Sequence, residues 1–198
     1  MIDDGGYFMP LPEKNKKYTY ADYLTWSEEE RWEIINGVPY LQAAPTWQHQ
    51  AVLLELARQF ANYLQDKSCR VFTAPFDLRI PEANEKDEET TNVVQPDIII
   101  ICDNSGLKKT GYYGVPELII EVVSPSTGQK DKIEKFNLYE KAGVKEYWIV
   151  EPDEKVVMVF TLEEGRYGRP QMYSEEDKVK VSIFDNLVIE LKPVFERI

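Results

Sequence analysis

The stretch that decides the fold is residues 117–151, ELIIEVVSPSTGQKDKIEKFNLYEKAGVKEYWIVE. Residues 117–123 are apolar on both faces of the expected strand, which is typical of a central strand. Helix-start residues follow at 124–127, a helical pattern covers 129–142, and a strand pattern covers 146–151. The helix is long enough to cross over between two strands. We therefore expect an α/β (α+β) protein in which helices flank a mixed central sheet.

The patterns around this unit fit the same layered architecture. Thr46 can cap a helix over 46–65, and the Asn36-Gly37 pair predicts a β-hairpin. The other expected elements are a short helix at about 20–26 capped by Thr19 and strands at 70–80 (broken near Pro75), 95–101, 156–162 and 168–173. The chain order is therefore helix, strands, helix, strand, with extra strands at both ends.

Length and composition predict one domain that covers residues 1–198, with 43% hydrophobic residues to build its core. Residues 1–17 are expected to form an N-terminal extension, and the acidic stretch 82–92 a solvated, mobile loop. Two cysteines, Cys69 and Cys102, are too few for a disulfide framework or a zinc cluster, so we expect buried free thiols. No apolar run is long enough for a membrane helix, and the first residues do not form a signal peptide. These features predict a cytoplasmic protein without a membrane partner.

The acidic composition argues against a protein that holds DNA by bulk charge. The chain has 23 Lys+Arg against 35 Asp+Glu, a formal net charge of −12. Residues 49–81 hold 4 basic and 3 acidic side chains, and residues 128–145 hold 5 and 3, so these two segments have net charges of +1 and +2. Because salt screens charges over about 8 Å, the local pattern allows a phosphate substrate. The total predicts weak, salt-sensitive binding to nonspecific DNA.

Two acidic side chains interrupt strands that otherwise exclude charge. Asp97 shares a strand face with Ile99 and Ile101, and Glu121 lies within the apolar run 117–123. A buried carboxylate needs a cation or hydrogen-bond donors, and two of them on neighbouring strands could bind Mg²⁺ or Mn²⁺. The alternative is that Asp97 only opens its strand and that Glu121 pairs with a lysine.

Three further residues are candidates for the same site. Lys135 lies one helical turn before Tyr139 and could orient a nucleophilic water or offset charge on a phosphate; the alternative is a surface pair with Asp131. His49, the only histidine, could contact substrate or act as a general acid, although a lone histidine is more often structural. Glu33 stands beside the expected hairpin, where a carboxylate is also common for structural reasons.

Several catalytic classes are excluded by motif. The sequence contains neither a P-loop nor a Gly-x-Gly-x-x-Gly dinucleotide motif, and it lacks the Gly-x-Ser-x-Gly elbow. A histidine-dependent triad has only His49 available. A two-carboxylate glycosidase would leave the lysine-bearing helix unexplained.

The ordered motifs of this chain resemble those of a known family. They are Pro96-Asp97, residues 120–127 (IEVVSPST), Asp131 with Lys135 and Tyr139, residues 143–150 (GVKEYWIV), Glu33 with Asn36-Gly37, and His49 at the start of the first long helix. This combination, which runs from about residue 18 to 195, resembles the Uma family of putative restriction endonucleases, assigned to the PD-(D/E)XK nuclease superfamily. The resemblance implies a restriction-endonuclease-like core of order αβββαβ.

The same resemblance implies a site and a chemistry. Asp97 and Glu121 would be metal ligands, Glu33 would join the metal-site neighbourhood, and His49 would lie near the substrate. The superfamily places a lysine two residues after the acid, and that position is Val123 here. The lysine role would then move to the following helix, to Lys135 or, in second place, Lys132.

The function expected from these features is Mg²⁺- or Mn²⁺-dependent hydrolysis of DNA phosphodiester bonds by an endonuclease. A second hypothesis is a catalytically degenerate nuclease fold that binds nucleic acid or a protein, which Val123 and the net charge favour. A third is a carboxylate enzyme with a deep closed pocket for a small molecule. DNA versus RNA, the recognition sequence and the biological role stay open, as does a homodimer, which would suit cutting both strands of a duplex.

Overall fold

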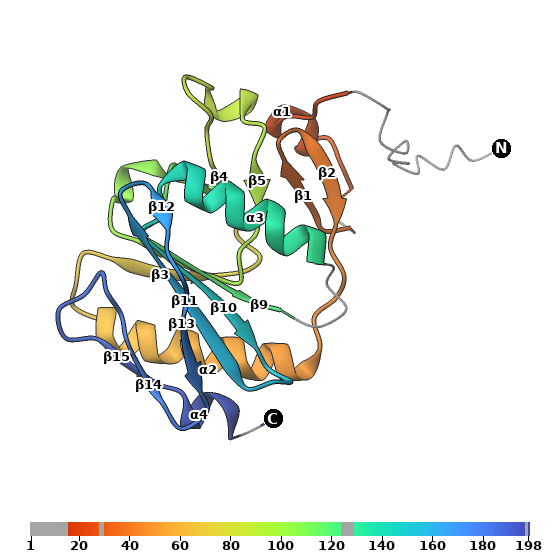
Figure 1. Ribbon diagram of the computed structural model, residues 1–198. Coiled ribbons are helices and arrows are strands. Elements are labelled where there is room, and N and C mark those ends of the chain that lie inside the picture. The colour runs from red at the N-terminus through yellow and green to blue at the C-terminus, as the bar shows by residue number, and fades with distance from the viewer. Residues whose placement is uncertain (1–15, 28–29, 124–128, 197) are drawn as a thin grey trace.

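The computed structural model describes residues 16–27, 30–123, 129–196 and 198, with the side chains of 129–132 outside this description. A seven-stranded mixed sheet forms its centre, in the order β12-β11-β10-β9-β6-β3, with β13 paired to β11 (Figure 1). Its strands are β3 (Arg70–Thr73), β6 (Ile98–Ile101), β9 (Leu118–Val122), β10 (Glu146–Glu151), β11 (Val156–Glu163), β12 (Arg166–Tyr167) and β13 (Gln171–Ser174).

The expected crossover is confirmed. Strand β9 pairs in parallel with β10, and helix α3 (Gln129–Ala142) connects them. Strand β6 lies between β3 and β9 and pairs antiparallel with both. Together with α2 (Trp47–Leu64), which precedes β3, these elements have the order αβββαβ that the resemblance implies.

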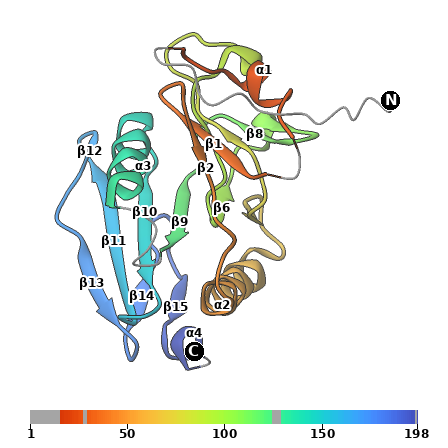
Figure 2. The same ribbon diagram turned by 90° about the vertical axis from the view of Figure 1, so that its right-hand side faces the viewer.

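The central sheet is buried on both faces, which explains its nearly continuous apolar strands. On one face, Leu56 and Phe60 of α2 pack in a core that also contains Ile98, Ile120 and Trp148. On the other face, a second core combines side chains of β6, β9 and β10 with Leu138 and Tyr139 of α3. Figure 2 shows α2 and α3 on either side of the sheet. Successive residues of β6 thus enter different cores, as the two-residue period of a strand requires.

A second sheet stands beside the first and carries the hairpin. Its order is β2-β1-β5-β4-β8-β7. Asn36 and Gly37 have positive φ angles of 53° and 79°, the conformation that a two-residue hairpin turn needs, so the Asn-Gly prediction is confirmed. The strands are β1 (Trp32–Ile35), β2 (Val38–Leu41), β4 (Leu78–Arg79), β5 (Val93–Val94), β7 (Leu107–Lys108) and β8 (Gly111–Tyr113).

The remaining elements are short. They are the helices α1 (Tyr20–Tyr23) and α4 (Lys192–Phe195), the 3-10 turns η1 (Asp87–Glu89) and η2 (Asn104–Gly106), and the hairpin β14 (Lys178–Lys180) and β15 (Val188–Glu190). The predicted caps are confirmed, since the hydroxyls of Thr19 and Thr46 accept hydrogen bonds from the backbone N–H of Asp22 and His49. The expected strand 70–80 is divided near Pro75 into β3 and β4, as its sequence predicts. The expected strand 168–173 begins only at Gln171, the first residue of β13, because Pro170 cannot donate to a ladder.

In the acidic stretch 82–92, whose composition predicts a solvated, mobile loop, residues 83, 84, 86, 88 and 89 are exposed, but the end of the stretch is anchored to the fold. Thr90 and Asn92 are fully buried, and the Asn92 side chain accepts a hydrogen bond from the backbone N–H of Asn36 at 2.7 Å. Asp87 forms an ion pair with the buried guanidinium of Arg79. Charge density alone does not reveal these contacts, because the partners Asn36 and Arg79 lie outside the stretch.

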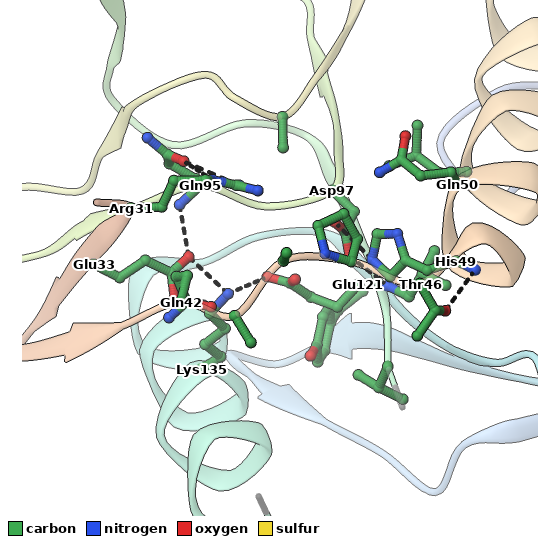
Figure 3. A pocket seen from close by; sticks show the side chains of 18 residues that line it. Arg31, Glu33, Gln42, Thr46, His49, Gln50, Gln95, Asp97, Glu121 and Lys135 are labelled. Atoms are coloured by element: carbon green, nitrogen blue, oxygen red, sulfur yellow. Dashed lines mark hydrogen bonds and ion pairs between the residues drawn. The ribbon is translucent and has the colours of Figure 1, made fainter. Parts of the chain in front are cut away.

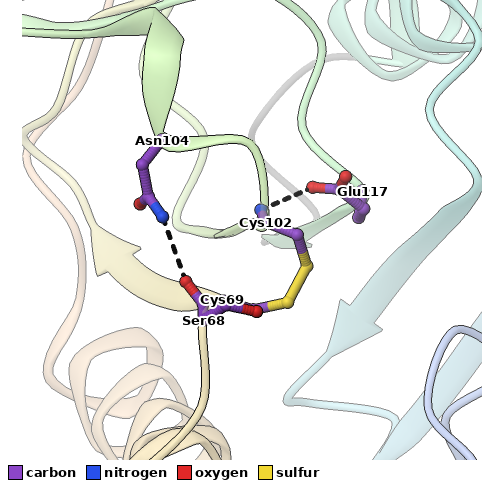
Figure 4. Close-up of a disulfide and its surroundings, with 5 residues drawn as sticks. All are labelled: Ser68, Cys69, Cys102, Asn104 and Glu117. Carbon is purple, nitrogen blue, oxygen red and sulfur yellow. Dashed lines mark hydrogen bonds between the residues drawn. A yellow bond between two sulfur atoms is a disulfide. The ribbon is translucent and has the colours of Figure 1, made fainter.

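The expectation of two free thiols is also wrong. Cys69 and Cys102 form a disulfide, with their Cα atoms 3.9 Å apart (Figure 4). Cys69 directly precedes Arg70 and Cys102 directly follows Ile101, and these two residues form the last pair of the antiparallel β3–β6 ladder. The strand register therefore brings the two cysteines face to face. Periodicity identified both strands but could not reveal this register.

Two expectations concern residues outside the description. They are most of the N-terminal extension, residues 1–15, and the helix-start residues 124–127. Within the described part of the chain, no helix is both long enough and apolar enough to cross a membrane.

Candidate functional site

A cavity of about 180 Å³ opens between β1, the start of α2, the ends of β6 and β9, and α3 (Figure 3). All five candidate residues line it, namely Glu33, His49, Asp97, Glu121 and Lys135. It is smaller than the roughly 300–1,000 Å³ of typical small-molecule sites, so the hypothesis of a deep small-molecule pocket loses support.

Lys135 joins two of the carboxylates. Its Nζ atom lies 2.8 Å from Oε1 of Glu33 and 3.0 Å from Oε1 of Glu121. The lysine side chain is 12% exposed, so the pair of contacts is shielded from water. Burial alone would lower the pKa of Lys135, but Glu121 and Glu33 raise it, which keeps the ammonium charged. The alternative of a purely surface lysine is therefore wrong.

Glu121 is held from its buried side. The hydroxyl of Tyr139, one turn after Lys135 on α3, donates to Oε1 of Glu121 at 2.7 Å. Burial, opposed by Lys135 and reinforced by Asp97 and Glu33, raises the pKa of Glu121 from 4.5 to about 7. The i, i+4 spacing on α3 thus places a cation and a neutral donor on one carboxylate oxygen.

Asp97 precedes β6 and contacts the neighbouring strand and α2. Its Oδ2 accepts a hydrogen bond from the backbone N–H of Val122 at 2.8 Å. Its Oδ1 lies 3.1 Å from Nε2 of His49, which the first turn of α2 presents. Asp97 therefore does more than open its strand, because it ties β9 and α2 to the same side chain.

Glu33 is almost completely buried at 2% exposure. Besides Lys135, its Oε1 accepts a hydrogen bond from the backbone N–H of Gln95 at 2.7 Å. Since Gln95 stands two residues before Asp97, this bond connects the second sheet to the strand that carries Asp97.

The sequence analysis did not single out Gln95 and Arg31. The guanidinium of Arg31 donates to Oε1 of Gln95 from Nε at 3.2 Å and from Nη2 at 3.1 Å. The Gln95 amide in turn donates to Oδ1 of Asp77 at 2.9 Å. Gln95 occurs in the strand pattern 95–101, but its partners are 18 and 64 residues away, so no local signal marks it.

The donor set fits a hard divalent cation. Glu33, Asp97 and Glu121 carry three negative charges when ionised against the two positive charges of Lys135 and Arg31, which leaves a net charge of −1 among the charged side chains that line the cavity. Among the described residues no group of three or more His, Cys, Asp or Glu side chains could hold a metal ion by itself. Mg²⁺ is commonly bound through one or two carboxylates, with waters and substrate phosphates as the other ligands. Asp97 and Glu121 are the two residues that would hold it.

The position of the second-choice lysine is known only in part. Lys132 lies within α3, but its side chain and that of Asp131 lie outside the described residues. Val123, at the position where the superfamily has its lysine, lines the cavity, and its backbone N–H pairs with Val150. Of the two lysines considered, Lys135 is the one with described contacts at the site.

Comparison with known proteins gives three matches. The family model Uma2, described as "Putative restriction endonuclease", matches residues 20–192. "Uncharacterized protein slr1290" from Synechocystis sp. is 32% identical over 125 residues, which are 62% of this chain and 62% of that protein. The crystal structure of a "putative nuclease belonging to DUF820" from Anabaena variabilis aligns with a TM-score of 0.73 at 20% identity. That alignment covers 90% of this chain and 97% of the other. The last likeness shows a shared fold.

Proposed function

Because this chain belongs to the Uma2 family, whose description is "Putative restriction endonuclease", we propose that it is a divalent-metal-dependent endonuclease that hydrolyses DNA phosphodiester bonds. Membership of this family supports the activity of a nuclease-like hydrolase. The divalent metal ion, the DNA substrate and the catalytic residues are what we propose in addition. The observation that carries it is one cavity in which Asp97, Glu121 and Lys135 meet, although 38 residues separate the first from the last.

Asp97 and Glu121 would bind Mg²⁺ or Mn²⁺ in the cavity that both residues line. A bound ion of this kind polarises the phosphodiester and lowers the pKa of a coordinated water. The protein orients the two carboxylates beforehand, because Val122 fixes Asp97 through its backbone N–H and Tyr139 fixes Glu121. Such prior orientation lets the charged groups act without reorganising during the reaction.

Lys135 would act as the catalytic lysine. Its ammonium group stands between two carboxylates and faces the cavity, so it can orient the attacking water or offset negative charge that grows on the phosphate. Glu33 holds Lys135 on the side away from Glu121, which makes Glu33 a positioning residue for the lysine.

The geometry of His49 favours a positioning role over that of a general acid. Its Nε2 contacts Asp97, and its Nδ1 is buried without a hydrogen-bond partner among the described residues. The contact with Asp97 occupies Nε2, and Nδ1 is buried, so neither nitrogen is exposed to donate a proton to a leaving group. We propose that His49 holds Asp97 in the orientation that a metal ion requires.

The direct test is cleavage of supercoiled plasmid and of a single-stranded circle by the purified protein in Mg²⁺ and in Mn²⁺. We expect metal-dependent nicking that EDTA abolishes. Asp97→Asn and Glu121→Gln should remove it, whereas Met172→Ala, which changes an exposed side chain on β13, should not. Activity that survives in Asp97→Asn would contradict the proposal.

A degenerate nuclease fold that binds nucleic acid or protein is the second candidate, and Val123 is the observation that favours it. Isothermal titration calorimetry separates the two functions. Heat of Mn²⁺ binding to the wild type that disappears in Glu121→Gln supports the metal-dependent enzyme. No heat with or without DNA, together with no cleavage, supports the degenerate fold.

We propose that the protein acts in the cytoplasm, because that is where its proposed substrate, DNA, would be found. The Cys69–Cys102 disulfide opposes it, because disulfides are rare in reducing compartments. Counting free thiols in protein extracted under alkylating conditions tests the point: two alkylated cysteines agree with the cytoplasm, and none argues against it.

A further inference from the structure

The wall of the cavity that faces solvent differs in chemistry from its floor. The floor contains the carboxylates and Lys135, whereas residues 42–46 and Gln50 line the cavity from an exposed position or, for Gln42, a half-buried one. Residues 41–54 contain no Asp, Glu, Lys or Arg, in a chain that is 29% charged. We call residues 42–47, Gln50 and Leu54 the neutral rim.

The neutral rim exposes a large aromatic side chain and a large aliphatic one. Trp47 is 63% exposed and Leu54 is 69% exposed. On α2, steps of three and four residues separate Trp47 from Gln50 and Gln50 from Leu54, so the three side chains share one face of the helix. Because Gln50 lines the cavity, this helix face runs from the cavity outward.

The amides of the neutral rim are free to bind a ligand. Among the described residues, neither the Gln42 nor the Gln50 side chain has a hydrogen-bond partner. A glutamine side chain offers donors and an acceptor that match the edges of nucleobases, and the face of an indole stacks on a base. A rim built to grip the phosphates of a duplex would instead need Lys and Arg.

From this juxtaposition of a phosphate-cleaving floor and an uncharged rim, we propose that the neutral rim binds an unpaired nucleobase by stacking on Trp47 and hydrogen bonding to Gln42 or Gln50. The inference rests on the proposed function and narrows its substrate to single-stranded nucleic acid or to a duplex with an unpaired nucleotide. In an intact duplex the faces of the bases are already stacked and are closed to Trp47.

Binding is measured apart from cleavage, in the Glu121→Gln background with Mg²⁺ present. The probes are a fluorescein-labelled single-stranded DNA 12-mer of mixed sequence and the same strand in a perfect duplex, both followed by fluorescence anisotropy. We expect the single strand to bind at least about tenfold more tightly than the duplex. Trp47→Ala should weaken single-strand binding about 5- to 100-fold, the range for loss of one stacked base, and leave duplex binding unchanged.

Two variants act as controls. Trp47→Phe keeps an aromatic face and should retain most of the single-strand affinity. Met172→Ala removes a side chain that is 61% exposed on β13, outside the lining of the cavity, and should change neither affinity. Since Trp47 is mainly exposed, none of these variants should lower the melting temperature by more than a few degrees.

Several results would overturn the inference. Equal or tighter binding of the perfect duplex, or an unchanged affinity in Trp47→Ala, would do so. A dimer in sedimentation equilibrium that Trp47→Ala dissociates would assign the neutral rim to a second copy of the chain instead.

Cleavage assays keep the two proposals apart. Trp47-dependent binding of single strands without cleavage by the wild type would leave the base site in place and remove the nuclease. Efficient metal-dependent cleavage of a perfect duplex that Trp47→Ala does not affect would leave the nuclease and remove the base site.

Discussion

Two buried glutamates on neighbouring parallel strands, Glu121 of β9 and Glu146 of β10, have different surroundings. Glu121 is 6% exposed and Glu146 is fully buried. Burial raises the pKa of both carboxyls. Glu121 lines a cavity and contacts Lys135, which also contacts Glu33. Glu146 has neutral donors on both oxygens.

The partners of Glu146 explain it as a structural residue. Its Oε1 accepts from the indole N–H of Trp148 at 2.6 Å, and its Oε2 accepts from the backbone N–H of Ser182 at 2.7 Å and from the Ser182 hydroxyl. These bonds attach the segment after β14 to the central sheet. Glu146 is also absent from the lining of the cavity, so no space for a ligand adjoins it there.

The difference teaches which buried acid marks a site. Both residues are desolvated, so burial and a raised pKa do not separate them. The separating features are the cation shared between two acids and the cavity in front of Glu121. A buried acid is a functional candidate when its charge balance is incomplete and space remains for a ligand.

DNA cleavage should show the largest difference between Glu121 and Glu146. Glu121→Gln should lower plasmid cleavage by at least about 10³-fold, because the Lewis-acid effect of the metal is worth several kcal/mol and the amide binds the ion weakly. Glu146→Gln should leave the cleavage rate per folded molecule within about twofold. Initial rates at matched folded protein concentration check both, and equal losses would show that the distinction is false.

The second largest effect is expected in the free energy of unfolding when Lys135 is replaced. Lys135→Met leaves Glu33 and Glu121 without their cation, and breaking one partner of a buried ion pair costs about 3–5 kcal/mol. Urea unfolding at pH 8 measures this loss, which should shrink at pH 5, where Glu121, with its raised pKa, binds a proton. A change of less than about 0.5 kcal/mol at pH 8 would contradict the assigned pairing.

Ser182→Ala tests the other glutamate. The substitution removes the hydroxyl donor from Oε2 of Glu146 but keeps the backbone N–H, so the free energy of unfolding should fall by about 1–2 kcal/mol. Cleavage should be unaffected. Calorimetric melting of wild type and variant provides the comparison, and an accompanying loss of activity would mean that Glu146 supports the site.

The pH dependence of Glu121 gives a smaller effect. Its pKa is about 7, so below that value a proton competes with the metal, and Mn²⁺ affinity should fall about tenfold per pH unit between pH 7 and 5. The raised pKa also makes the free energy of unfolding depend on pH. The contribution of Glu121 to stability is fully present below pH 4.5, where the carboxyl is protonated in both the folded and the unfolded protein. It is lost as the pH rises from 4.5 through 7. Calorimetric titrations at pH 5, 6, 7 and 8 measure the metal affinity, and a flat profile would contradict a protonated Glu121.

Tyr139→Phe should have the smallest effect. It removes the donor to Oε1 of Glu121 and leaves Lys135 in place, so we expect a loss of about 1 kcal/mol of stability and a few-fold decrease in Mn²⁺ affinity. Denaturation and metal titration on the same sample test it. A loss as large as that of Lys135→Met would mean that the tyrosine, and not the ammonium, holds Glu121.

Much of the fold follows from local patterns in the chain. The Asn36-Gly37 turn, the Thr46 cap and the crossover helix 129–142 depend on neighbours within a few residues, and the structure confirms each. The order helix, strands, helix, strand also follows from local patterns, and the family resemblance implied its αβββαβ form. The expectation of free cysteines failed, and the anchoring of Asn92 was not foreseen, because Cys69 and Asn92 find their partners 33 and 56 residues away.

The same distinction between local patterns and distant partners applies to the residues of the candidate site. The sequence alone identified Asp97 and Glu121, because a charge inside an apolar strand stands out without any knowledge of its partners. Only the tertiary structure placed Lys135 between Glu33 and Glu121 and set His49 on Asp97. It also revealed Gln95, Arg31 and Glu146. Residue type and period determine which face a side chain takes, but distances between separate elements depend on packing and register. Those are properties of the whole fold, and no segment of the sequence contains them.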